Sequence, residues 1–215
     1  MGKAEENKKL KKNRLLETAF NLFTTRGLAD TSVSDIAKEA GVGKGTFYLY
    51  FKGKEDIEAR IISHRTDQMF SHAFKILEER GSENATFEDK VIIVINDILD
   101  QFAADHMLLK FIYRNLSWGV FKSAIEIFST EEKFSSYEAL NRLTTEKQQK
   151  LEDPDMMFFA IIELVMSTCY DVIMRNDPVP LEKYRKYMDR YIRSIIKDHE
   201  MADAEGKSRY HFVYD

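Results

Sequence analysis

Two short helical patterns lie close together between residues 31 and 51, and their spacing constrains the fold more than any other feature of the sequence. In the first pattern, apolar residues recur with the period of an α-helix, at positions 33, 36, 37 and 40. Ser32 and Asp35 stand three residues apart at its start, as in a variant capping box. We therefore predict a short helix over residues 33–40.

The second pattern follows after a glycine-rich connection. Residues 44–50 form a very short helix in which Phe47 and, one turn later, Phe51 face inward. Gly41 and Gly43 can permit the sharp turn between two helices that pack at a steep angle. Together the two patterns predict a helix-turn-helix unit.

The same glycines raise an alternative, because GVGKGT at residues 41–46 looks like a loop that cradles phosphate. A P-loop needs a buried strand followed by G-x-x-x-x-G-K-[ST] and a helix. In this sequence the first glycine of that motif falls on Lys38, and the threonine comes one place late. The preceding residues form a helical face and not a strand. A P-loop-like nucleotide-binding enzyme therefore stays the weaker alternative.

Helical periodicity continues through the rest of the chain, and we find no segment that alternates as a strand would. Only three prolines and nine glycines occur among the 215 residues. Gly27 ends the first helical pattern as a C-cap does. Further helices are predicted at about residues 8–26, 54–80, 87–104, 106–129 (one broken or two short), 131–152, 155–174 and 181–196. The expected fold class is all-α.

Residues 15–57 carry a resemblance to a known family. The segments AFNLFTTRG, TSVSDIAKEAGV and KGTFYLYFKGKED are similar to the DNA-binding domain of the tetracycline-repressor (TetR) family. The resemblance implies an N-terminal three-helix helix-turn-helix domain, residues 1–53, and a larger C-terminal helical ligand-binding and dimerisation domain, residues 54–200. We expect residues 201–215 to form a mobile tail. The implied function is a sequence-specific transcriptional regulator, a dimeric repressor released from its operator by a small, mostly apolar ligand.

The residues of the second short helix suit a major groove. Threonine offers a hydroxyl and a methyl group to base edges, and tyrosine hydroxyls and lysines reach phosphates. Gly45 can let this helix approach another surface closely. A lysine at the start of the next helix opposes the helix dipole, and the resemblance implies a phosphate there. The predicted DNA contacts are Thr31, Ser32, Lys44, Gly45, Thr46, Tyr48, Tyr50 and Lys54.

Positive charge gathers near the N-terminus. Residues 1–60 carry 12 Lys and Arg against 9 Asp and Glu, whereas the whole chain has a formal net charge of −4. Five of these basic residues precede the first apolar helix face and can form an arm that contacts DNA phosphates: Lys8, Lys9, Lys11, Lys12 and Arg14. A solvated, frayed terminus explains them equally well.

The last two predicted helices suggest an assembly. Residues 155–174 are apolar around nearly the whole circumference, which requires burial on all sides. Residues 181–196 carry one wide apolar stripe. Two such helices from each of two chains would form a four-helix bundle across a two-fold axis. The predicted interface residues are Phe159, Ile162, Met166, Tyr184, Tyr187, Met188, Tyr191 and Ile195.

Large apolar residues between residues 102 and 170 could line an effector pocket, although an ordinary core has the same composition. The predicted lining residues are Phe102, Phe111, Trp118, Phe121, Tyr137, Met166 and Tyr170. If they only form a core, the chain is a DNA-binding protein of the same fold without an inducer.

Other function classes find little support. His64 and His72 are eight residues apart, too far for a zinc-binding pair on one helix, and Cys169 lies in an apolar helix where an inert thiol is expected. The longest apolar run, residues 156–162, is far shorter than a membrane span. We therefore expect a cytoplasmic protein with double-stranded DNA, a second copy and a small effector as partners. No enzymatic activity, cofactor, metal or membrane association is expected.

Overall fold

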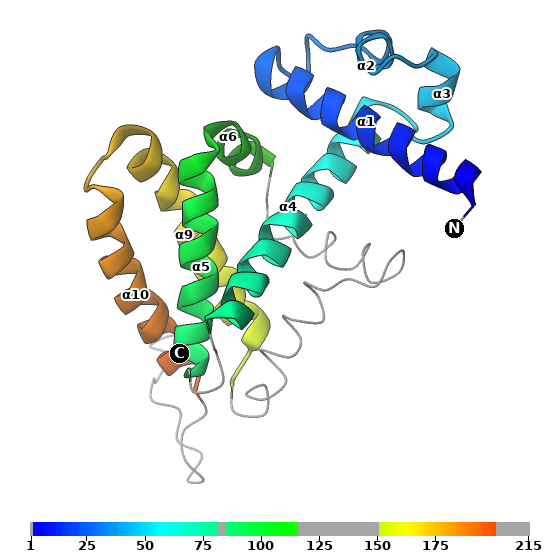
Figure 1. Cartoon of the computed structure of the whole chain (residues 1–215). Helices are drawn as coiled ribbons and strands as arrows, with labels where there is room; N and C mark the ends of the chain where they lie inside the picture. The colour runs from blue at the N-terminus through cyan, green and yellow to red at the C-terminus, as the bar shows by residue number, and fades with distance from the viewer. Residues whose placement is uncertain (1, 81–84, 116–150, 201–215) are drawn as a thin grey trace, which may run out of the picture.

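The computed structural model describes residues 2–80, 85–115 and 151–200, and within these ranges the regular elements are α-helices (Figure 1). An isolated antiparallel bridge joins Leu151 to Glu200. The all-α fold class is therefore confirmed. The helices are α1 (Lys3–Thr25), α2 (Val33–Glu39), α3 (Lys44–Tyr48), α4 (Lys54–Glu79), α5 (Phe87–Ala104), α6 (His106–Asn115), α9 (Pro154–Arg175) and α10 (Leu181–Asp198).

Helices α1, α2 and α3 form the upper right part of the molecule in Figure 1. Their packing rests on buried apolar side chains, among them Leu15, Ile36 and Phe47. Helix α1 begins five residues earlier than predicted, and Glu5 and Glu6 in its first turn favour this extension because acidic groups stabilise a helix N-terminus. Residues 3–48 thus hold three packed helices, and the predicted domain boundary at residue 53 stays a prediction.

Helix α4 runs from this three-helix unit into the larger body of the molecule (Figure 1). It packs against α1 near its start and against α5 further along. Polar contacts add to the α4–α5 packing: His72 Nδ1 lies 2.9 Å from Asp97 Oδ2, and Gln101 Nε2 of α5 donates to the Met69 carbonyl of α4 at 3.0 Å. One long helix therefore belongs to both parts of the molecule.

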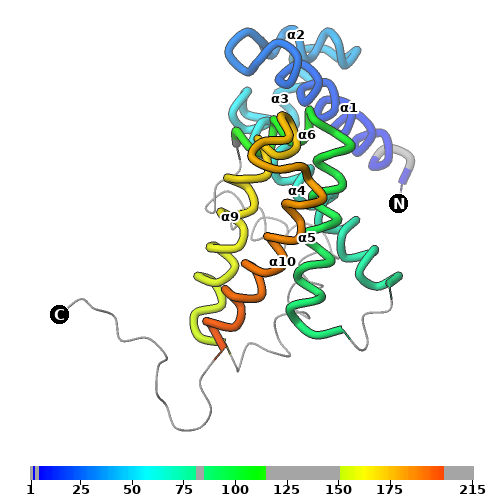
Figure 2. The backbone as a smooth tube through the Cα atoms, turned by 90° about the vertical axis from the view of Figure 1, so that its left-hand side faces the viewer, coloured from blue at the N-terminus to red at the C-terminus, as the bar shows by residue number. Residues whose placement is uncertain are grey.

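The body is completed by α5, α6, α9 and α10. Thr86 and Asp89 form a capping box that starts α5 where the sequence predicts it. Arg185 of α10 donates to the Asn96 carbonyl of α5 at 2.9 Å and ion-pairs with Asp100. Figure 2 shows α9 and α10 side by side on one face of the body, in agreement with their packing contacts.

A second contact joins the two parts of the molecule through α1 and α6. The rings of Phe20 and Phe111 meet edge to face, with centroids 5.2 Å apart. On α4, the guanidinium of Arg65 lies 4.2 Å from the Phe20 ring centroid and also forms an ion pair with Glu17 of α1. Phe20 is therefore held by both α4 and α6.

Helix α9 is the one described helix that is long and apolar enough to cross a membrane by length and composition. It carries a buried row that faces the body, formed by Met157, Ile161, Val165, Cys169 and Val172. It packs against α5, α6 and α10. Its most apolar window is 28% buried inside the chain, and length and composition alone are weak evidence for a membrane span.

Several predictions fall outside the described residues. These are the pocket residues Trp118, Phe121 and Tyr137, the predicted helix at 131–152 except for its last two residues, the part of the 106–129 prediction beyond α6, and the tail at 201–215.

Candidate nucleic-acid interface

The turn between α2 and α3 depends on one glycine. Gly41 has φ +66°, a left-handed conformation that a residue with a side chain rarely adopts. The N–H of the next residue, Val42, donates to the Ala37 carbonyl at 2.9 Å and closes the turn. Gly43 has φ −70° and is the N-cap of α3, so the turn does not require glycine there. The prediction that both glycines shape the turn is correct for Gly41 only.

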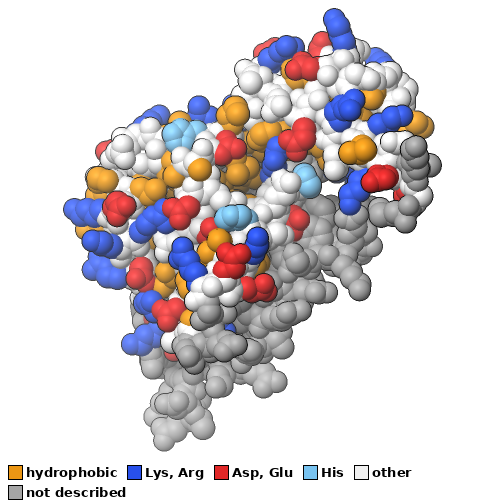
Figure 3. Space-filling view, viewed as in Figure 1, with side chains coloured by type: hydrophobic (Ala, Val, Ile, Leu, Met, Phe, Trp, Pro, Cys, Tyr) orange, Lys and Arg blue, Asp and Glu red, His pale blue; other side chains and the backbone are white. Residues whose placement is uncertain are grey.

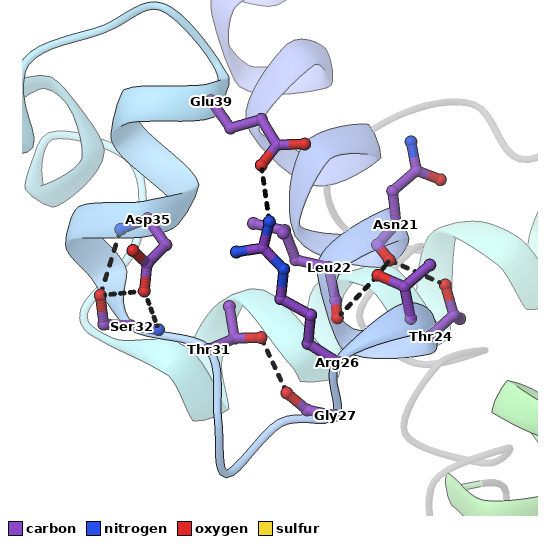
Figure 4. A network of polar contacts seen from close by, with 10 residues as sticks. Asn21, Leu22, Thr24, Arg26, Gly27, Thr31, Ser32, Asp35 and Glu39 are labelled. Carbon is purple, nitrogen blue, oxygen red and sulfur yellow. Dashed lines mark hydrogen bonds and ion pairs between the residues drawn. The ribbon is translucent and has the colours of Figure 1, made fainter.

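The start of α2 is held by the predicted capping box (Figure 4). The N–H of Asp35 donates to Ser32 Oγ at 3.1 Å, and the N–H of Ser32 donates to Asp35 Oδ2 at 2.9 Å. The pKa of the Asp35 carboxyl is lowered, mainly because the carboxylate accepts a hydrogen bond from the Ser32 hydroxyl. Ser32 lies exposed at this helix start, where a phosphate could approach it.

Thr31 does not lie on the surface, contrary to its predicted role as a DNA contact. Only 1% of the residue is exposed. Its hydroxyl donates to the Gly27 carbonyl at 2.7 Å, within the loop that joins α1 to α2 (Figure 4). The Thr31 hydroxyl therefore stabilises this loop, and the role of Thr31 in the structure is to hold the loop and not to contact DNA.

Two further contacts brace the three-helix unit. Arg26 at the end of α1 approaches Glu39 of α2 at 3.9 Å (Figure 4). Lys54 at the start of α4 donates from Nζ to the Leu28 carbonyl at 2.9 Å. The Lys54 ammonium thus ties α4 to the α1–α2 loop, and because it has three donor hydrogens it keeps the capacity to bind a phosphate as well.

Helix α3 has a buried and an exposed side. Phe47 and Phe51 are buried, with ring centroids 5.5 Å apart, as predicted. Lys44 and Gly45 are exposed, Tyr48 is 52% exposed, and Thr46 is half-buried. Tyr50 lies beyond the last residue of α3, is half-buried and packs against the core, which leaves less of its side chain available than predicted.

The structure also exposes a residue of this region that the sequence reasoning missed. Leu49, the C-cap of α3, is 79% exposed. Its position could have been found from the sequence, because it lies one helical turn after Gly45 and opposite the buried Phe47.

The basic residues before Leu15 lie on the N-terminal half of α1. Lys8, Lys9, Lys11 and Arg14 are exposed, and the segment is helical and continuous with the rest of α1. The guanidinium of Arg14 comes within 3.9 Å of the place where a side chain on Gly41 would begin. Figure 3 shows Lys and Arg side chains over this part of the molecule. Positive charge therefore reaches the α2–α3 turn.

Comparison with known proteins decides what this arrangement is. Residues 15–61 match the family described as bacterial regulatory proteins of the tetR family. This part of the chain is therefore a DNA-binding domain of the TetR type. The match spans α2 and α3 together with parts of α1 and α4, which are the helices of the helix-turn-helix unit and its connections. The strand that a P-loop needs before GVGKGT is replaced by α2 in this structure, so the phosphate-loop interpretation is wrong.

The similar proteins are also named as regulators. The chain is 35% identical over 103 residues to the "Fatty acid metabolism regulator protein" of Bacillus subtilis, a match that covers 48% of this chain and 51% of that protein. It is 36% identical over 106 residues to an HTH-type transcriptional regulator of Staphylococcus aureus, covering 49% and 52%. The chain thus spans about half the length of several of the curated relatives that it matches.

Solved structures share the fold over most of the chain. The fatty acid degradation regulator FadR from Bacillus halodurans has a TM-score of 0.59 at 21% identity, covering 92% of this chain and 97% of that one. A TetR-family regulator from Syntrophomonas wolfei has a TM-score of 0.63 at 18% identity, covering 88% and 96%. At these identities the likeness shows the fold alone.

The predicted pocket residues do not share one surrounding. Phe102 is fully buried in the core, and Phe111 is buried against Phe20 of α1. Met166 and Tyr170 are half-buried on α9, where the Tyr170 ring stacks on Tyr113 with centroids 4.5 Å apart. With the other three residues outside the described ranges, the pocket stays a prediction.

Two of the predicted interface residues face inward. Tyr184 and Met188 of α10 are buried in the core of the chain itself, so their side chains are not on the outer surface. Burial raises the pKa of Tyr184 to about 12. The apolar stripe of α10 is thus turned mainly toward the chain's own core. The remaining predicted residues are half-buried, and Tyr191 is exposed.

Cys169 has the surroundings of a structural thiol. It lies in the buried row of α9, and burial raises its pKa to about 12. The thiol is therefore protonated at neutral pH, whereas a nucleophile would need the thiolate.

Proposed function

We propose that the chain is a transcriptional regulator of the TetR type, a homodimeric repressor that binds an operator of two half-sites and leaves it when a small, mostly apolar molecule binds the body. The observation that carries the proposal is the apolar character of α9 and α10 beyond their buried rows. Without a partner chain, these side chains would remain in contact with water.

The proposed interface is formed by the outer sides of α9 and α10. Its side chains are exposed or half-buried in the single chain: Met156, Phe159, Ile162, Met166, Tyr187, Tyr191 and Ile195. A two-fold axis beside this face would bring four helices together, two from each chain. Each helix-turn-helix domain would then meet one of two half-sites about one helical turn, or a multiple of it, apart.

The assembly is tested by the mass in solution. The chain has a mass of 25.2 kDa, and we expect light scattering at micromolar concentration to give twice this value. Tyr191→Glu should yield monomers, since Tyr191 is 46% exposed and its replacement does not disturb the core of the single chain. Leu10→Glu, on the exposed side of α1, is the matched control and should stay dimeric. A 25.2 kDa monomer for the unmutated chain would rule out the dimer.

Three observations support an apolar effector. The body is rich in buried apolar side chains. The Thr66 hydroxyl on α4 is buried, and among the described residues it has no hydrogen-bond partner, so it could bind a polar atom of a ligand. A relative that matches 48% of the chain is named a fatty acid metabolism regulator. We therefore propose an amphipathic effector with a long apolar part.

The effector is tested with a panel of amphipathic compounds that includes free fatty acids. A true effector should raise the melting temperature and weaken binding to the operator, with a coupling of about 1–3 kcal/mol between the two sites. Thr66→Val should reduce this coupling if the hydroxyl binds the ligand. If every compound that stabilises the protein leaves DNA affinity unchanged, the chain is a DNA-binding regulator without an inducer.

A further inference from the structure

Leu49 has a position that its packing does not explain. With 79% of the residue exposed, it is more accessible than any other exposed large apolar residue that the structure describes. Its backbone is well fixed, because its N–H donates to the carbonyls of Gly45 and Thr46 at 3.2 and 3.3 Å. A leucine with a fixed backbone and a side chain left in water at the end of α3 suggests a partner surface.

The direction of Leu49 follows from helix geometry. Successive residues of an α-helix are rotated by about 100°, so Leu49 lies about 200° around the axis from Phe47. Phe47 is buried, and Leu49 is therefore close to the centre of the outer face of α3. Gly45 lies one turn earlier on the same face, and apart from its chain neighbours and its own helix backbone no atom approaches within 4 Å of the place where a side chain would begin.

The outer face of α3 thus combines bare backbone at Gly45 with an apolar side chain at Leu49. Lys44 and Tyr48 flank it and can bind phosphates or sugars. The methyl group of thymine is the apolar group that a major groove presents to such a side chain. A leucine without hydrogen-bonding groups can distinguish base pairs by this methyl group.

We propose that Leu49 is a specificity-determining residue that packs against the methyl group of one thymine in each half-site. The inference rests on the proposed reading of an operator by α3. It adds a base contact that lies outside the set derived from the sequence, and it specifies which base that contact selects.

The test uses a duplex selected by the full-length protein from a random pool. Each thymine of this duplex is replaced in turn by deoxyuridine, which removes only the methyl group. We expect one position in each half-site at which the substitution weakens binding about fourfold, the factor that burial of one methyl group produces. Leu49→Ala should abolish this penalty, whereas Met107→Ala, an exposed apolar residue on α6, should retain it.

Two results would overturn the inference while leaving the proposed function intact. In one, no deoxyuridine weakens binding of the unmutated protein. In the other, the penalty persists in Leu49→Ala, which would assign the methyl contact to another side chain such as that of Thr46. If the protein selects no duplex over random DNA, the proposed function itself fails and the inference with it. Because Leu49 is exposed, Leu49→Ala should keep the melting temperature of the unmutated protein.

Discussion

The contact between Phe20 and Phe111 joins the DNA-binding domain to the body, and its strength can be measured. Replacing either residue by leucine keeps an apolar side chain of similar size but removes the edge-to-face ring contact at 5.2 Å. Such aromatic pairs contribute about 0.5–1.5 kcal/mol beyond the burial of their area. We therefore expect a coupling free energy of about 1 kcal/mol between Phe20→Leu and Phe111→Leu in a double-mutant cycle.

The assay is urea unfolding of the unmutated protein, both single variants and the double variant. Phe74→Leu is the matched control, since Phe74 is a buried aromatic residue nine positions after Arg65 on α4, or about 13 Å further along the helix. At such a separation, the effects of Phe74→Leu and Phe20→Leu on the free energy of unfolding should be additive. A coupling between Phe20 and Phe111 no larger than that control, or below about 0.3 kcal/mol, would refute the view that this pair holds the two parts together.

Three further predictions concern local contacts. Thr86→Ala removes the cap of α5 and should lower stability by about 1 kcal/mol, seen as a lower melting temperature; an unchanged value would contradict the cap's role. Lys54→Ala removes the bond to the Leu28 carbonyl and a proposed phosphate contact, so a salt series should show weaker DNA binding and a slope reduced by about one unit per half-site. An unchanged salt slope would limit Lys54 to its structural bond. Burial lowers the pKa of His64 in the folded chain, so as pH falls through about 6.5 the unfolded chain binds a proton first and stability decreases. His64→Gln should lose less stability between pH 7.5 and 5.5, and equal losses would contradict this assignment.

Helix positions could be predicted from the sequence because their signals are local. The Ser32–Asp35 box and Gly27 mark the loop between α1 and α2 with side-chain and backbone conformations that depend only on neighbouring residues. The apolar repeats of α9 and α10 place both helices within two residues of their observed ends. The family resemblance, carried by the same short segment, identified the DNA-binding domain.

The direction of individual side chains could not be predicted in the same way. Tyr184 and Met188 belong to an apolar stripe, but the sequence does not say whether a stripe faces its own core or a partner. Phe111 packs against α1, a neighbour more than 80 residues away in the chain. Thr31 could equally have been a surface hydroxyl, and only the folded α1–α2 loop brings the Gly27 carbonyl within its reach.

The central claim is that α3 reads the sequence of an operator, and the most direct test is the binding of the protein to a selected duplex and to random duplex DNA over a salt series. At physiological salt we expect the selected duplex to bind at least about a thousandfold more tightly. Thr46→Ala should cost about 1–3 kcal/mol on the selected duplex and relax the preference at one position per half-site. Equal affinity for both duplexes, or a Thr46→Ala variant with unchanged affinity and base preference, would contradict the claim.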